Sequence, residues 1–130
     1  MSLKEIHNFD YAVLLCENLP NTRLFYKDVM GFLLEHDADN WVSFRVGATL
    51  LTLRPRGSTP AWDDGPAVSG STNIQLAFRV PPSAVDTCYE ELLANDVPIL
   101  REPTELPDWR HRALFFRDPE DNVIEIYAEY

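Results

Sequence analysis

The sequence predicts an α+β fold: two βαβββ modules whose strands form a curved mixed sheet around a shared cavity. Two observations predict it. The hydrophobic pattern in each half of the chain reads as a strand, a helix and three strands, so the order of elements repeats. A segment rich in Pro and Gly, residues 55–72, separates the halves and reads as a connector. We therefore expect one domain over residues 1–130, with module 1 at about 8–54 and module 2 at about 73–130. Because neither module can close its own sheet, a shared cavity follows.

The first module begins with an apolar strand at residues 9–16. A helix at residues 20–30 follows, because apolar residues such as Leu24 and Val29 recur on one helical face. Gly31 is suited to end this helix, since glycine adopts a left-handed conformation without strain. Three short strands are then expected at residues 32–36, 41–46 and 49–54.

The second module repeats this order, with a strand at residues 73–80 and a helix at residues 83–94. Ser83 is placed as the N-cap of the helix, because its hydroxyl can accept a backbone hydrogen bond there. A long loop at residues 102–111 accounts for the different spacing of the two halves. The remaining strands are expected at residues 97–101, 112–116 and 123–128.

The composition is that of an acidic globular protein. With 21 acidic residues and 11 Lys and Arg, the net charge is −10, which argues against a nucleic-acid-binding surface and against binding to anionic membranes. Residues 11–16 are the longest apolar run and are too few to cross a bilayer. Cys16 and Cys88 do not form a disulfide framework and fit free thiols in a reducing cytoplasm. We therefore expect a cytoplasmic protein that binds a small molecule or another protein.

Two motifs carry a family resemblance. They are residues 24–32 (LFYKDVMGF) and residues 115–126 (FFRDPEDNVIEI). Together they resemble the vicinal oxygen chelate superfamily, which includes glyoxalase I, bleomycin-resistance proteins, extradiol dioxygenases and fosfomycin-resistance enzymes, and whose glyoxalase-like fold has two βαβββ modules. The superfamily string in the second motif is D-P-D-G-N-x-I-E-L, and Asp121 replaces its Gly. Asp118 is expected to make a tight turn by binding backbone amides, and Asn122 to adopt the left-handed conformation.

The resemblance implies a site at four strand positions on the concave face of the sheet. Superfamily members that use a metal place its ligands there, and the matching residues are Tyr11, Thr52, Gln75 and Glu125. Glu125 and Gln75 are the candidate ligands for Zn, Ni, Mn or Fe, because their oxygens suit a divalent ion. A protonated Tyr11 is a poor ligand and Thr52 a weak one. Without a metal, Glu125 is the candidate catalytic base, with Tyr11 as its acid partner, or it binds a cationic group. The alternative is a structural floor in which these side chains hydrogen-bond to one another.

Five further residues are candidates for ligand binding. Arg54, Arg79 and Arg112 are expected at inward or rim positions, where an arginine needs a carboxylate or an anionic ligand. Trp109 and His111 belong to the long loop, which is expected to border the mouth of the cavity.

Three functions are compatible with these residues. The first is a small-molecule-binding protein, metal-free or weakly metal-binding, as the likeness to bleomycin-resistance proteins implies. The second is a metal-dependent lyase, isomerase or dioxygenase that acts on a small substrate with vicinal oxygens. The third is a metal-free lyase or isomerase that uses Tyr11 and Glu125 as acid and base. The superfamily pattern also implies a homodimer.

Overall fold

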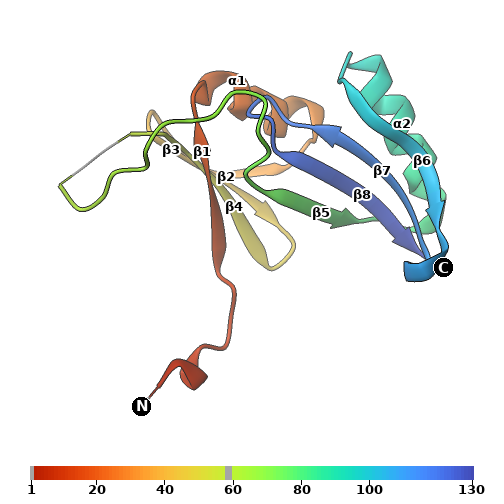
Figure 1. Cartoon of the computed structure of the whole chain (residues 1–130), viewed down its shortest axis with the longest axis horizontal. Helices are drawn as coiled ribbons and strands as arrows, with labels where there is room; N and C mark the ends of the chain where they lie inside the picture. Colours follow the sequence, from red (N-terminus) through yellow and green to blue (C-terminus); the bar gives the residue numbers. More distant parts are fainter. Residues whose placement is uncertain (1, 58–59) are drawn as a thin grey trace. The chain divides into compact units, whose positions relative to one another are not determined.

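The computed structural model describes residues 2–57 and 60–130 and confirms the α+β fold with two repeated modules (Figure 1). The chain divides into two compact units, of which the first extends to Pro66 and the second begins at Ala67. Each unit contains one four-stranded mixed sheet. The boundary between the units falls inside the segment that was expected to be the connector.

The first unit has the strand order β1-β4-β3-β2, in which β1 pairs parallel with β4 and the other pairs are antiparallel. A 3-10 turn, η1 (Leu3–Glu5), precedes the sheet. A helix in two parts connects β1 to β2: α1 (Leu19–Leu24) and the π-helical η2 (Phe25–Val29). The strands are β1 (Tyr11–Cys16), β2 (Leu33–Ala38), β3 (Trp41–Val46) and β4 (Thr49–Pro55).

The second unit repeats this arrangement with the strand order β5-β8-β7-β6, in which β5 and β8 are parallel. Its helix, α2 (Val85–Ala94), follows a 3-10 turn, η3 (Pro82–Ala84), and a second such turn, η4 (Pro107–Trp109), precedes β7. The strands are β5 (Gln75–Arg79), β6 (Ile99–Leu106), β7 (His111–Arg117) and β8 (Val123–Glu129). Within the described ranges, no helix has the length and apolar character needed to cross a membrane.

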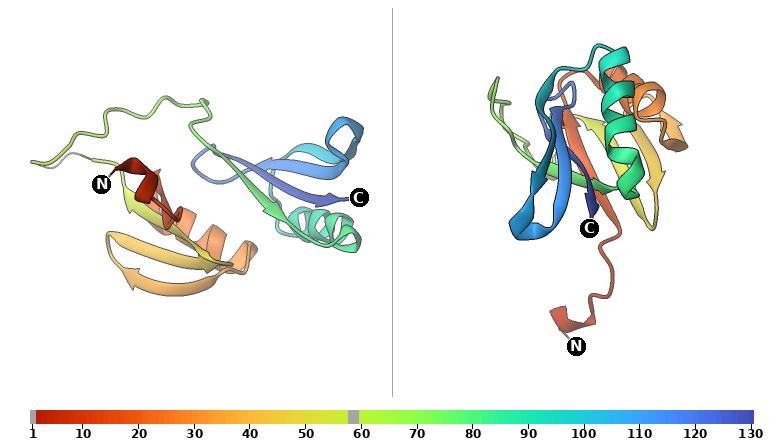
Figure 2. Two further views of the ribbon diagram at one scale, coloured as in Figure 1. Left: turned by 90° about the horizontal axis from the view of Figure 1, so that it is seen from below. Right: turned by 90° about the vertical axis from the view of Figure 1, so that its right-hand side faces the viewer.

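In each unit the core lies between the helix and one face of the sheet (Figure 2). Alternation along the strands decides which side chains belong to it. In β1, Leu14 and Cys16 are buried whereas Tyr11 is 46% exposed, and in β8 Ile124 and Ile126 are buried. Burial of a large apolar side chain contributes about 1.5–3 kcal/mol, so these rows determine which way each strand faces. We call the other side of each sheet its helix-opposed face.

The helix predicted at residues 20–30 is not one regular α-helix. From Phe25 it continues as a π-helix, in which the Met30 amide donates to the Phe25 carbonyl at 3.0 Å. In this stretch Tyr26 is fully buried, whereas Leu24, the last residue of α1, was expected on the apolar face and is 50% exposed. A period of 3.6 residues cannot reveal a turn that contains an extra residue.

Two predictions for the second module are wrong. The N-cap of α2 is Ala84 and not Ser83, because η3 precedes the helix and no side chain caps it. Residues 102–111 do not form a loop: β6 continues to Leu106, and only η4 and Arg110 connect it to β7. β6 lies at the edge of the sheet, and its pairing with β7 is irregular. An edge strand tolerates extra residues and a proline, because one of its sides has no neighbouring strand.

Candidate functional site

The second sheet carries a polar group of side chains on its helix-opposed face. Because side chains alternate along β8, Ile124 and Ile126 face α2 and Glu125 faces the other side. The register places Ala77 of β5 and Phe115 of β7 beside Glu125 on that face. Glu125 thus stands between a methyl group and an aromatic ring, and its side chain is only 13% exposed.

Glu125 has a glutamine and a histidine as its polar neighbours. Gln75 Nε2 donates a hydrogen bond to Glu125 Oε1 at 3.2 Å. His111 Nδ1 lies 4.0 Å from Glu125 Oε2, and His111 Nε2 lies 3.9 Å from Glu129 Oε1. The imidazole stacks on the Tyr127 ring with 4.3 Å between their centroids. Stacking therefore holds the imidazole between two carboxylates.

This arrangement is suited to binding a positive group and to exchanging a proton. Within the described part of the chain, Glu125 has no ion pair with Lys or Arg, so its carboxylate is available to a ligand that brings a cation or a hydrogen-bond donor. Imidazole is the side-chain group best suited to gain or lose a proton near neutral pH. Glu129 and Tyr127 were missed by the sequence reasoning. They are alternate residues after Glu125, and strand alternation alone could have found them.

The turn before β8 determines the direction of the strand that carries Glu125. Asp118 is buried, and its Oδ1 accepts hydrogen bonds from the backbone amides of Glu120 at 2.9 Å and Asn122 at 3.0 Å. Its Oδ2 accepts another from Asn122 Nδ2 at 2.9 Å. The expected turn through Asp118 is confirmed, but the left-handed residue is Asp121, with φ of 66°, and not Asn122. Asp121 stands where the superfamily string has Gly, so it adopts the conformation that favours glycine.

Tyr11 and Thr52 lie on the helix-opposed face of the first sheet. Tyr11 meets the Trp41 ring edge-on, with 6.2 Å between centroids. Thr52 is 1% exposed, and its hydroxyl shares a 2.8 Å hydrogen bond with the Ser43 hydroxyl on the neighbouring strand. The four expected site positions therefore form two pairs in separate units, and within the second pair the side chains are hydrogen-bonded to each other.

Arg54 and Arg79 each have a carboxylate partner in their own unit. Arg54 binds Asp64 through two hydrogen bonds of 2.7 and 2.8 Å, and its guanidinium lies 5.2 Å from the centre of the Trp62 ring. These hydrogen bonds lower the pKa of Asp64 to about 2. Arg79 forms an ion pair with Glu129 at 3.1 Å. The sequence indicated that each arginine needs a carboxylate or an anionic ligand, and both have a carboxylate.

Arg112 faces the opposite way from Glu125. Its guanidinium binds Asp86 of α2 at 2.7 Å and Glu105 of β6 at 2.9 Å, which raises the pKa of Arg112. Arg112 was expected at an inward or rim position, and alternation along β7 places it on the side of the sheet that faces α2. Trp109 lies at the end of η4 and is 68% exposed.

The donors at the four implied positions do not fit a divalent metal ion. Glu125 and Gln75 supply a carboxylate and an amide oxygen. The Thr52 hydroxyl is buried in its bond with Ser43, and the phenol of Tyr11 is a poor ligand while neutral. In residues 2–57 and 60–130 there is no group of three or more His, Cys, Asp or Glu side chains suited to holding a metal ion.

The repeated βαβββ units, together with a strand glutamate that follows the Asp118 turn, define a protein of the vicinal oxygen chelate superfamily. The model of one family within this class, described as the glyoxalase-like domain, matches residues 9–129. The chain belongs to that family.

Known proteins resemble the chain over most of its length. The protein YraH of Bacillus subtilis (strain 168) is 27% identical over 119 residues, which are 88% of this chain and 92% of that protein. A glyoxalase/bleomycin resistance protein/dioxygenase from Nocardioides superposes with a TM-score of 0.84 at 20% identity, covering 96% of this chain and 85% of that one. Lactoylglutathione lyase from Agrobacterium tumefaciens superposes with a TM-score of 0.76 at 19% identity, covering 95% of both chains. At these identities the superpositions show a common fold.

Proposed function

We propose that this chain binds a small molecule on the helix-opposed face of its second sheet, through Glu125, Gln75 and His111. One observation carries the proposal: the Glu125 carboxylate is 13% exposed, yet within the described residues its polar neighbours are a glutamine amide and a histidine. Enclosing a carboxylate without a cationic partner is unfavourable. A ligand that brings positive charge or hydrogen-bond donors would stabilise it.

The neighbours of Glu125 suggest a role for each part of the site. Gln75 uses its amide nitrogen on Glu125, which leaves its carbonyl oxygen as a second acceptor for the ligand. Phe115 and the stacked ring of Tyr127 offer apolar surface beside these acceptors. The net charge of −10 favours the approach of a cation over that of an anion. The proposed ligand is therefore neutral or cationic, with donors at one end and an apolar part.

A metal-dependent lyase, isomerase or dioxygenase is the competing function. One observation favours it: His111 Nδ1 and Glu125 Oε2, which are both of the type that binds divalent ions, lie 4.0 Å apart. Binding of Zn²⁺, Ni²⁺, Mn²⁺ or Fe²⁺ at this pair would make His111 a ligand as well as Glu125. The two functions differ in whether metal uptake depends on Glu125.

Thermal melts of the purified protein distinguish the two functions. The four metal salts are crossed with a panel of small cations and neutral hydrogen-bond donors, including a cationic glycopeptide. We expect members of the organic panel to raise Tm, because a ligand at a hundredfold excess over its Kd adds about 2.7 kcal/mol to the free energy of unfolding. Glu125→Gln keeps the shape of the side chain and removes its charge, so the rise should disappear. Glu90→Gln removes the same charge from an exposed position on α2 and should leave the rise unchanged.

Three results would overturn the proposal. Stoichiometric metal uptake that is lost in Glu125→Gln would establish the metal-dependent function instead. If the ligand still raises Tm in Glu125→Gln, the ligand binds somewhere other than this face. If no member of the panel changes Tm, the ligand class is wrong.

We also propose that the protein is a cytoplasmic homodimer. Trp62, in the chain segment that follows β4, is 50% exposed, and tryptophan is enriched at protein–protein interfaces. Cys16 and Cys88 are not joined in a disulfide, which fits a reducing compartment. Sedimentation equilibrium at micromolar concentration should give the mass of a dimer, and a clean monomer would contradict the proposal.

A further inference from the structure

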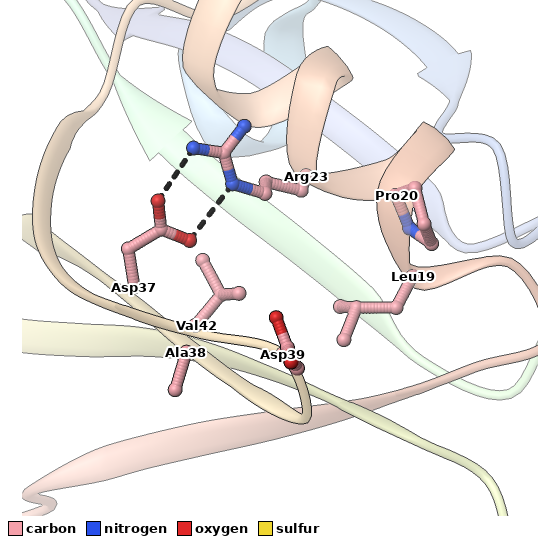
Figure 3. A pocket seen from close by; sticks show the side chains of 7 residues that line it. All are labelled: Leu19, Pro20, Arg23, Asp37, Ala38, Asp39 and Val42. Carbon is pink, nitrogen blue, oxygen red and sulfur yellow. Dashed lines mark hydrogen bonds and ion pairs between the residues drawn. The ribbon is translucent and has the colours of Figure 1, made fainter.

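A hollow of about 320 Å³ lies in the first unit between the start of α1 and the turn that joins β2 to β3 (Figure 3). Val42 of β3 faces α1, so the hollow opens on the helix-facing side of the sheet, opposite to Tyr11 and Thr52. Pockets that hold small molecules begin at about 300 Å³. The residues that line it are Leu19, Pro20, Arg23, Asp37, Ala38, Asp39 and Val42.

The hollow has an apolar floor and a charged rim. Leu19 and Val42 form the floor, and both are almost fully buried. On the rim, Arg23 donates to Asp37 from Nε at 2.9 Å and from Nη2 at 2.6 Å, as Figure 3 shows. These bonds lower the pKa of Asp37, so it is ionised and its charge is balanced by Arg23.

Asp39 supplies the charge on the rim that remains unbalanced. Within the described residues it has no hydrogen bond or ion pair, and its carboxylate lies beside Leu19 in the view of Figure 3. The lining therefore carries one net negative charge above an apolar floor. Its chemistry complements a molecule with a positive head and a short hydrocarbon body.

We propose that this hollow binds a small primary ammonium compound, with the ammonium group on Asp39 and the hydrocarbon on Leu19 and Val42. A primary ammonium has three N–H donors for the carboxylate oxygens. The described residues that line the hollow include no aromatic ring, so a quaternary ammonium, which is recognised by aromatic faces, finds no such partner among them. A volume of about 320 Å³ has room for a short-chain amine.

Amide chemical shifts of the ¹⁵N-labelled protein test this site directly. The protein is titrated separately with butylammonium chloride, tetramethylammonium chloride and sodium butyrate at equal ionic strength. We expect saturable shifts at the amides of Leu19 and Asp39 with butylammonium alone. Asp39→Asn removes the unbalanced charge and should weaken binding about three- to fivefold, which is the upper part of the range for an exposed ion pair. Glu90→Gln changes net charge equally and should leave the affinity unchanged.

Three results would overturn the inference. One is equal binding of tetramethylammonium, which would indicate general attraction of cations to an acidic protein. Another is unchanged affinity in Asp39→Asn, and the third is the absence of saturable shifts at these amides. The amides of Gln75 and Glu125 are read in the same spectra, so binding at the proposed site of the second unit is scored independently.

Discussion

The two units build the same sheet and differ in what they place on its helix-opposed face. In β4 of the first unit, Thr52 is 1% exposed and its hydroxyl is satisfied by Ser43. At the matching position in β8, Glu125 is a carboxylate that is 13% exposed and has Gln75 and His111 as its polar neighbours. On the first face the buried hydroxyl is thus satisfied within the sheet, and we call that face closed. On the second face the Glu125 carboxylate has no Lys or Arg partner among the described residues. Repetition of the fold does not entail repetition of the site.

The turns that lead into the two matching strands differ in the same way. Between β3 and β4, the left-handed residue is Gly47, with φ of 59°. Glycine has no Cβ, so it adopts this conformation without strain. Between β7 and β8, a non-glycine residue, Asp121, has φ of 66°, and the buried Asp118 side chain holds the turn together. The turn before Glu125 therefore depends on side-chain chemistry, and the turn before Thr52 on backbone freedom.

The largest expected effect concerns the second turn. Asp118→Ala removes the acceptor of two backbone amides and of the Asn122 amide, which are left without partners in a buried place. We expect the free energy of unfolding to fall by about 3 kcal/mol, since buried donors that lose a charged acceptor are costly. Urea denaturation followed by circular dichroism measures it. Asp118→Asn keeps one oxygen and should lose less; a loss below about 1 kcal/mol in Asp118→Ala would mean that the turn is held mainly by its backbone.

The next effect tests whether the first face is closed by its hydroxyl pair. Thr52→Val keeps the shape of the side chain and leaves the buried Ser43 hydroxyl without a partner, so we expect a loss of about 1–2 kcal/mol in the free energy of unfolding. Removing both hydroxyls in Ser43→Ala/Thr52→Val should restore most of that loss, because no buried polar group is then unsatisfied. If the double variant is as unstable as the sum of the singles, the hydrogen bond is not what closes this face.

A smaller effect compares the left-handed residues of the two turns. Gly47→Ala forces a side chain into the left-handed region, so the free energy of unfolding should fall by about 1 kcal/mol. Asp121→Gly removes such a side chain but makes the unfolded chain more flexible, so the change should stay within about 0.5 kcal/mol. Both variants are measured by urea denaturation. Equal losses would show that the two turns are held in the same way.

Features with a local signal in the sequence could be predicted. Residues 41–46 were predicted as a strand with the bounds that β3 has, because turn signals flank both ends. The direction of Glu125 followed from the apolar residues on either side of it in the strand. The left-handed residue was placed one position too late, because Asn122 and Asp121 are both residue types that tolerate this conformation.

Features that depend on register and on distant partners could not be predicted. The bond between Thr52 and Ser43 requires the exact pairing of β3 with β4, and periodicity does not supply it. The partners of Arg112 could not be predicted, because Asp86 lies in the separate helix α2 and Glu105 lies in the neighbouring strand β6. The shared cavity, and the role of Tyr11 as an acid, stay predictions.

The last prediction concerns the segment that follows β4, where Arg54 is held by Asp64 instead of facing a ligand. Hydrogen bonds from Arg54 lower the pKa of Asp64 from 3.8 to about 2. Because the folded value lies below the unfolded one, the ion pair stabilises the protein fully above about pH 4 and loses this effect as the pH falls towards 2. Wild type should therefore exceed Asp64→Asn in the free energy of unfolding at pH 7, with the difference vanishing near pH 2. Asp10→Asn, on an exposed residue before β1, should show no such convergence. A carbon NMR titration of the Asp64 carboxyl gives its pKa directly. A value near 4 would mean that Arg54 is free to pair with an anionic ligand, and the first unit would then also offer a charged group to a ligand, as is proposed for the second.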